Sequence, residues 1–536
     1  MAAGAAQLYI CLRARFGGAV GGAGDMGEPP VTPVSVVGDL WQLGSQRLIC
    51  GDSTSAPGLG RRRGNDGYVH GRRARDSADV ARPGHEAPAT DGCVTRFSGR
   101  DWWFIGLLGT IYMANFIDRM IISVVGEPIR REFGLSDLQL GIMGGVAFAL
   151  FYGGIGIPIA PLAERVNRGG IVAAATALWS AMTLLSGAAT SYAQLLLARM
   201  GVGIGEAGFT PPVVSMIADR FDADKRATVF SLIAAGVSVG GAVGALAGGW
   251  IAQTHGWRMA FMVMGGPGLL LAALLWLTIH EPARRDAGEV APPLKQVLRV
   301  VGRSPAFVGF TVGSGMVALV GFGLNLFLIP LLIRRFGFDL SSAALTFALT
   351  FSMATALGGV VGGMLADHFA AQNHRRYGLL PIAGSAMALP LYLTAIYQDD
   401  WRIMAGLLFA ATFSLYAFLP TIMTVTQRLV APRMRATASA IHAFGQTVFG
   451  LGMGSAFLGW MSDWLARRAF GAGYAEVCLS AKRQAPTALC QAASGTGLQQ
   501  ALLLLGLFLL LAMACYWIAA GSIAGEIAAI EEPQPS

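Results

Sequence analysis

Charged side chains occur at two places inside long apolar runs of this 536-residue chain. Asp118 and Arg119 are adjacent, with Asn115 one turn before them, and Arg199 precedes Glu206 by seven residues. Seven residues make nearly two helical turns, so Arg199 and Glu206 project from one helix face about 10 Å apart. A charge at membrane depth costs at least about 2.5 kcal/mol, so each is expected to face a partner or a wet cavity.

These residue types predict proton-coupled anion binding. A buried carboxyl group beside an arginine can be paired or protonated, and protonation releases the guanidinium to bind an anionic head group bidentately. Asp118 and Glu206 are therefore the candidate proton carriers, and Arg119 is the candidate anion ligand. A permanent salt bridge between the two runs is the alternative, as is a purely structural ion pair of Arg199 and Glu206.

The composition is that of a multi-pass membrane protein. Hydrophobic residues make up 54% of the chain and charged residues only 13%, against about 25% charged residues in soluble proteins. The net charge of +8 fits the excess of Lys and Arg in cytoplasmic loops and does not indicate nucleic-acid binding. The six cysteines show no metal-ligand spacing, and we expect neither a metal nor a cofactor.

Twelve apolar runs are long enough to cross a bilayer. Because they are too long and too continuous for barrel strands, they predict an all-helical membrane bundle. Their approximate bounds are residues 102–125, 138–160, 170–190, 192–215, 227–252, 257–279, 305–333, 342–365, 378–397, 401–426, 436–461 and 499–522.

The chain divides into two similar parts. A polar linker at residues 281–304 separates six runs in residues 101–280 from six in residues 305–522, and a tail follows at 523–536. The triplet Arg226-Ala-Thr returns as Arg435-Ala-Thr about 209 residues later. Such matches indicate parallel six-helix repeats around a central site, which is an architecture of transporters.

Charge asymmetry predicts the orientation. The loops on the side of the N-terminus hold fifteen Lys and Arg residues, against ten on the other side. This bias favours both termini in the cytoplasm and a location in the cell (inner) membrane. Residues 1–100 are rich in Gly, Arg, Ala and Pro without sustained periodicity. We expect them to be mostly disordered or the result of a misassigned start, and a regulatory tail is the alternative.

From about Asp101 to Trp517 the chain resembles the major facilitator superfamily. The loop PLAERVNR at residues 161–168 is similar to the superfamily signature between spans two and three, with Glu164 in place of the usual Asp and Asn167 in place of a usual Gly. The sequences NFIDRMIISVV, LLLARMGVGIGEAGFTPP and HGWRMAFMVMGGPG resemble the Spinster-like branch. The resemblance implies the twelve-helix major facilitator fold, in two six-helix pseudo-repeats.

The resemblance also implies a function. Relatives in the Spinster-like branch move sphingolipids, lysophospholipids and other amphiphiles, and their arginine and glutamate corresponding to Arg199 and Glu206 lie on the transport pathway. Small-anion symporters share a similar pattern, so the substrate class stays open. We interpret four residues at the predicted cytoplasmic ends as a gate that latches the two halves in the outward-open state; simple topogenic charge is the alternative for the arginines. They are Glu164, Arg165, Arg168 and Asp367.

Polar and aromatic residues in the second half are weaker candidates for lining a cavity, because each can equally serve an interhelical hydrogen bond or the core. They are Phe322, Asn325, Tyr416, His442 and Gln446. Cys478 and Cys490 share a loop predicted to lie outside the cytoplasm, where a disulfide can form.

The sequence thus predicts a monomeric, proton-coupled secondary transporter that works by alternating access. Its partners would be protons, membrane lipids and an amphiphilic or organic anionic solute such as a lysophospholipid. A small organic anion:proton symporter and a non-transporting receptor or scaffold are the alternatives, although costly buried charges on two runs argue against a scaffold. No nucleophile–base pair, phosphate-binding loop or metal cluster in the sequence points to an enzyme.

Overall fold

The structure is a computed structural model that describes residues 97–163, 166–279, 281, 293–370, 374–479 and 488–531. All regular structure within these ranges is helical, which confirms the predicted class, and each of the twelve predicted runs lies in helix. Ten segments are long and apolar enough to be spans by themselves. The fourth and eleventh runs are not among those ten. The prediction for residues 1–100 falls almost entirely outside the described residues.

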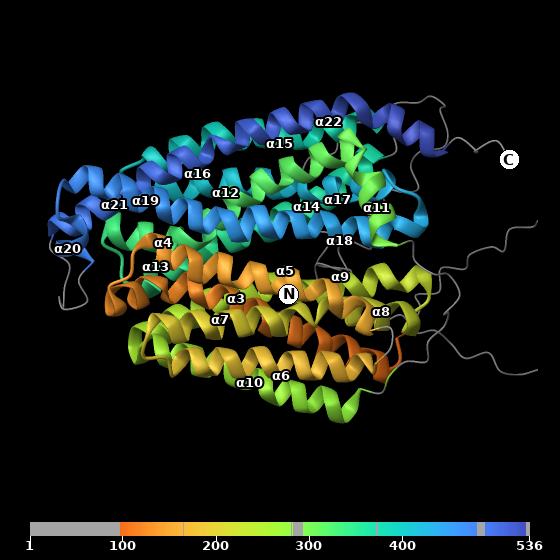
Figure 1. Ribbon diagram of the computed structural model, residues 1–536, viewed down its shortest axis with the longest axis horizontal. Helices are drawn as coiled ribbons and strands as arrows, with labels where there is room; N and C mark the ends of the chain where they lie inside the picture. Colours follow the sequence, from red (N-terminus) through yellow and green to blue (C-terminus); the bar gives the residue numbers. More distant parts are fainter. Residues whose placement is uncertain are drawn as a thin grey trace, which may run out of the picture. The chain divides into compact units, whose positions relative to one another are not determined.

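We use "first half" for residues 97–281 and "second half" for residues 293–531 (Figure 1). The first half contains α3 (Gly99–Phe133), α4 (Asp137–Gly141), the π-helical turn η1 (Ile142–Val146), α5 (Ala147–Ala163), α6 (Arg168–Gly187), α7 (Tyr192–Ala207), α8 (Thr210–Arg220), α9 (Ala223–His255) and α10 (Trp257–Thr278). Here α4, η1 and α5 form the second predicted run, and α7 with α8 forms the fourth.

The second half begins with a short helix inside the predicted linker and ends with a helix that continues through most of the predicted tail. Its helices are α11 (Leu294–Gly302), α12 (Pro305–Phe336), α13 (Leu340–Phe347), η2 (Ala348–Ser352), α14 (Met353–Ala370), α15 (His374–Tyr397), α16 (Trp401–Ala417), α17 (Leu419–Arg428), η3 (Pro432–Met434), α18 (Arg435–Gln446), η4 (Thr447–Gly454), α19 (Ser455–Phe470), α20 (Tyr474–Cys478), α21 (Ala488–Gly506) and α22 (Phe508–Glu531).

Local capping chemistry sets the turn between α3 and α4. Gly134 ends α3 in the left-handed conformation (φ 64°), which glycine adopts at little cost. Ser136 then starts α4 as a capping box with Gln139, which satisfies free backbone N–H groups at both residues. The N-terminus of α4 is thereby fixed at one end of the bundle, where it meets the second half.

Glycines let α9 lie directly on α3. The four-residue spacing of Gly236, Gly240 and Gly244 puts them on one face of α9, and a Cβ at Gly240 would collide with the carbonyl oxygen of Met113. A Cβ at Gly244 would lie 3.1 Å from Ile117 Cα. Such small-residue stripes permit close packing of membrane helices. This packing fixes the part of α3 that carries the central charges.

Candidate functional site

The central site lies where α3 meets α7. Arg119 Nε donates to Glu206 Oε2 at 2.6 Å, and the Arg119 side chain is 23% exposed while that of Glu206 is fully buried. The guanidinium carbon of Arg119 also lies 5.2, 5.1 and 4.9 Å from the ring centroids of Phe116, Phe148 and Tyr152. Arg119 therefore has one buried anionic partner, an aromatic surround and a side still open to a ligand.

Asp118 and Arg199 occupy the buried side of the same site. Thr183 Oγ1 donates to Asp118 Oδ2 at 3.2 Å, and Arg199 Nη1 donates to the backbone oxygen of Asp118 at 3.4 Å. Among the described residues, Asp118 Oδ1 and Arg199 Nε have no hydrogen-bond partner. Asn115 is also buried, one turn before Arg119 on α3. All five residues predicted for the central site are thus brought together, with hydrogen-bonding capacity left over.

Glycines of α7 bring its charged residues this deep into the bundle. A Cβ at Gly203 would lie 2.8 Å from Phe148 O on α5, and a Cβ at Gly205 would lie 2.7 Å from Trp179 N on α6. Only glycine permits both backbones to approach so closely. The helix can therefore hold Glu206 fully buried between its neighbours, within reach of Arg119.

A second charged cluster, which the sequence reasoning missed, joins the two halves at the end of the bundle where α3 ends. Arg334 of the second half donates to Glu127 Oε2 at 3.0 and 2.7 Å and to both oxygens of Asp137 at 2.7 Å. All three side chains are at most 2% exposed. Arg130 adds a contact of 3.0 Å to Asp137. We call these residues, together with Asp463, the latch cluster.

Asp463 extends the latch cluster to the backbone of α4. Its two carboxylate oxygens accept from the N–H groups of Asp137 and Leu138 at 3.0 and 2.9 Å. A carboxylate at a helix N-terminus satisfies free N–H groups and is favoured by the helix dipole. Deeper in the same interface, Ser123 donates to Asn325 at 3.0 Å. The two halves are therefore closed against each other at this end.

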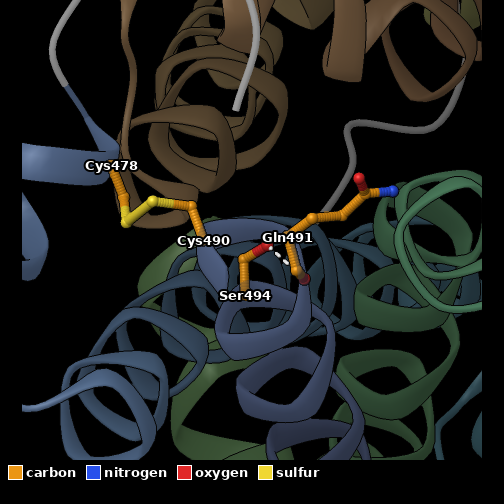
Figure 2. The surroundings of a disulfide bond; sticks show 4 residues. All are labelled: Cys478, Cys490, Gln491 and Ser494. Carbon is orange, nitrogen blue, oxygen red and sulfur yellow. Dashed lines mark hydrogen bonds between the residues drawn. A yellow bond between two sulfur atoms is a disulfide. The ribbon is translucent and has the colours of Figure 1, made fainter. Parts of the chain in front are cut away.

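A disulfide stands beside the latch cluster. Cys478 of α20 is bonded to Cys490 of α21, as the sequence suggested (Figure 2). Figure 2 also shows Ser494 donating to the backbone oxygen of Gln491 on the same helix. The disulfide lines a small polar pocket together with neighbouring residues, namely Glu127, Arg130, Arg131, Arg334, Tyr474, Gln491 and Ser494. The disulfide thus fixes α20 next to the latch cluster.

Of the predicted gate residues, Arg168 is described with its side chain, and it lies at the opposite end of the bundle, where α6 begins. Arg168 is buried and pairs inside the first half, with Glu281 at 2.7 Å and with Asp219. Glu164, Arg165 and the side chain of Asp367 lie outside the described residues. The gate therefore stays a prediction.

The predicted cavity residues of the second half differ in their surroundings. Asn325 bonds across the interface, and His442 is fully buried, with Nδ1 3.2 Å from Thr311 Oγ1. Tyr416 packs edge-on against Phe351 and is partly buried, as are Phe322 and Gln446. Cavity lining by all five residues stays a prediction.

Two helical halves that enclose buried charges and close against each other at one end define the protein as a membrane transporter. A family profile agrees: the chain belongs to the Major Facilitator Superfamily, whose profile matches residues 108–455. Members of this superfamily are transporters and not enzymes, which confirms the prediction on enzyme activity.

Individual relatives confirm the likeness to the Spinster-like branch. An MFS-type efflux pump of Mycolicibacterium smegmatis is 31% identical over 400 residues, covering 73% of this chain and 92% of the relative. Human protein spinster homolog 1 is 30% identical over 266 residues, which span only 49% of its length. The crystal structure of a bacterial homolog of the human lysosomal transporter Spinster, inward-facing and unoccupied, matches with a TM-score of 0.73 and 32% identity, covering 82% of this chain and all of that one.

Proposed function

We propose that this protein is a proton-coupled secondary transporter that moves an amphiphilic or organic anionic solute, such as a lysophospholipid, by alternating access. The observation that carries the proposal is the Arg119–Glu206 pair, in which a partly exposed guanidinium is held by a fully buried carboxylate at 2.6 Å. Protonation of Glu206 removes the charge that holds Arg119, so an anionic head group can replace it. Proton and substrate therefore bind cooperatively.

Asp118 is the second candidate proton carrier. It is buried, and its Oδ1 lacks a partner among the described residues, so it can take up a proton without losing a hydrogen bond. The rings of Phe116, Phe148 and Tyr152 around Arg119 offer an apolar wall next to the anion ligand. A cation beside an apolar wall suits a head group attached to an acyl chain.

The latch cluster supports an inward-facing assignment of this conformation. We place the protein in the inner membrane of the cell, with both termini in the cytoplasm. In this orientation the latch cluster lies on the side of the membrane away from the cytoplasm, here called the outer side. The outer side is then closed. In the outward-facing state, Glu164, Arg165 and Arg168 would close the cytoplasmic side together with Asp367.

One relative favours a small organic anion as the alternative substrate. A probable L-galactonate transporter of Escherichia coli is 32% identical over 186 residues, which cover 33% of this chain. A sugar acid carries a carboxylate that Arg119 could bind, but it has no acyl chain to use the aromatic wall.

Purified protein in proteoliposomes tests the proposal. Lumenal pH is followed while lysophospholipids, sphingoid phosphates or small organic anions are added. We expect an amphiphile to drive proton movement that Glu206→Gln and Asp118→Asn abolish. Glu132→Gln is the matched control, because Glu132 pairs with Arg258 at 2.6 Å on the exposed end of α3. If only small organic anions drive proton movement, the substrate is a small anion and not an amphiphile. If no added solute drives proton movement, transport is not coupled to protons.

A further inference from the structure

α11 is a surface helix that the central site does not use. It lies in the linker directly before α12, packs on α12 and α18, and in Figure 1 runs across the ends of the spans and not along them. Its inward contacts are Val297 and Val301, which are buried in one cluster with Phe307 and Phe310. α11 therefore lies against the end of the second half, directly before the candidate span that begins at Pro305.

The side of α11 away from these contacts is basic. Lys295, Arg299 and Arg303 follow each other at four-residue spacing, and all three are exposed. Residues at this spacing share one helix face. Within the described ranges, no carboxylate pairs with any of the three, and Glu526 at the end of α22 accepts from Ser304 instead. The basic face is thus free to bind an anion from outside the protein.

Apolar side chains lie between the basic face and the buried face. Leu294 and Leu298 are one turn apart and 45% and 48% exposed. Val308, in the first turn of α12, is also 42% exposed. Helices with a basic face next to exposed leucines lie in the head-group region of a bilayer, with the leucines at the acyl boundary.

We propose that α11 is an interfacial helix that binds anionic phospholipid head groups of the leaflet on its side, which is the cytoplasmic leaflet in the orientation proposed above. Lys295, Arg299 and Arg303 contact the phosphates, and Leu294 and Leu298 enter the acyl boundary. Because α11 belongs to the segment that joins the two halves, this contact anchors the linker to the membrane. The lipid site is separate from Arg119, and its occupant is a membrane lipid and not the transported solute.

Lipid retention by the purified full-length protein tests this proposal. The protein is titrated in detergent with dioleoyl-phosphatidylglycerol or dioleoyl-phosphatidylcholine, and bound lipid is counted by native mass spectrometry beside the thermal unfolding midpoint. We expect the anionic lipid to bind more tightly, and the combined variant Lys295→Gln, Arg299→Gln and Arg303→Gln to weaken its binding at least about tenfold. The charge-keeping variant Lys295→Arg, Arg299→Lys and Arg303→Lys should retain it.

Two controls separate this site from other causes. The first control is the combined variant Arg402→Gln, Arg467→Gln and Arg468→Gln, which replaces three exposed arginines at the other end of the bundle. This variant should bind the anionic lipid as tightly as the wild type does. The other is Arg119→Gln, which disables the proposed transport site and should leave this binding intact. Equal binding of both lipids, unchanged binding by the α11 variant, or loss of binding in Arg119→Gln would each overturn the proposal.

Discussion

Two arginines of the same chain show how surroundings decide what a buried cation can do. Arg334 is 1% exposed and makes four hydrogen bonds to two carboxylates. Arg119 is 23% exposed and bonds one carboxylate, with aromatic rings around it. Arg334 has little donor capacity left for a ligand, so it suits a lock. Arg119 can exchange its partner, so it suits a binding site.

Arg119→Lys tests whether the guanidinium itself is needed. Lysine keeps the charge but loses the planar fork that stacks on rings and binds anions bidentately. We expect the substrate KM to rise about tenfold or more, measured as uptake into proteoliposomes. Arg220→Lys is the matched control, because Arg220 also pairs with a carboxylate, Asp101 at 3.0 Å, and lies 4.8 Å from a ring, that of Phe104. An unchanged KM in Arg119→Lys would contradict the assigned role.

Burial and pairing of a charged residue could be predicted from the sequence where the charge stands out against an apolar background. Asp118, Arg119 and Glu206 lie well inside their apolar runs. Because an unpaired charge at membrane depth is energetically costly, the sequence predicts that each is buried beside a partner. Glu127 and Arg334 lie just past the predicted ends of their runs, at residues 125 and 333, where a charge looks like part of a loop. Their helices continue to Phe133 and Phe336, which brings both charges inside.

At the scale of elements, the contact between α3 and α9 decides where the central site lies. Gly236, Gly240 and Gly244 form the face of α9 that packs on α3, but the sequence does not say which helix meets that face. That choice depends on contacts between residues about 130 positions apart, such as Gly240 with Met113. The π-helical turns η1, η2 and η4 were likewise not predicted, because they change the helix register without a sequence signal such as proline.

Gly240→Ala tests this packing. The new Cβ would collide with the carbonyl oxygen of Met113, and backbone cannot move aside as a side chain can. We expect a loss of about 1–3 kcal/mol of stability, seen as a lower thermal unfolding midpoint. Its neighbour provides the control, since a Cβ at Gly241 would have only Ser352 Oγ within 4 Å, at 3.9 Å. If Gly241→Ala lowers the midpoint as much as Gly240→Ala does, the contact is not responsible.

Arg334→Met tests whether the latch cluster holds α12 against α3 and α4. Removing one partner of a buried ion pair costs about 3–5 kcal/mol, because Glu127 and Asp137 keep their charges without compensation. That cost falls on the closed conformation. We expect faster hydrogen exchange at the first amides of α4, which Asp463 protects, measured by mass spectrometry.

The neighbouring arginine is the control for this variant. Arg335 pairs with Asp399 at 2.8 Å and donates to the backbone oxygen of Ile396 at 2.7 Å, and both of these partners lie outside the latch cluster. Arg335→Gln should therefore leave hydrogen exchange at α4 unchanged. Equal exchange rates at α4 in Arg334→Met and the wild type would show that the latch cluster does not hold this end closed.

At the scale of the whole molecule, the described residues show charged pairs between the halves at one end of the bundle and within the first half at the other. The latch cluster and the Ser123–Asn325 hydrogen bond join the halves at one end, while at the other Arg168 pairs with Glu281 and Asp219 within the first half. The duplicated motifs and the equal number of runs predicted the two-part architecture. These sequence features did not predict which end is closed. The inward-facing and outward-facing states have the same sequence and differ only in which residues of the two halves pair.

In the proposed function, Glu206 couples proton movement to substrate movement. The most direct measurement compares Glu206→Gln with the wild type in two proteoliposome assays, one of substrate accumulation driven by a proton gradient and one of substrate exchange without a gradient. A glutamine cannot release a proton, so we expect the variant to lose accumulation and to keep exchange. Gradient-driven accumulation at the wild-type rate in Glu206→Gln would show that Glu206 does not carry the coupled proton.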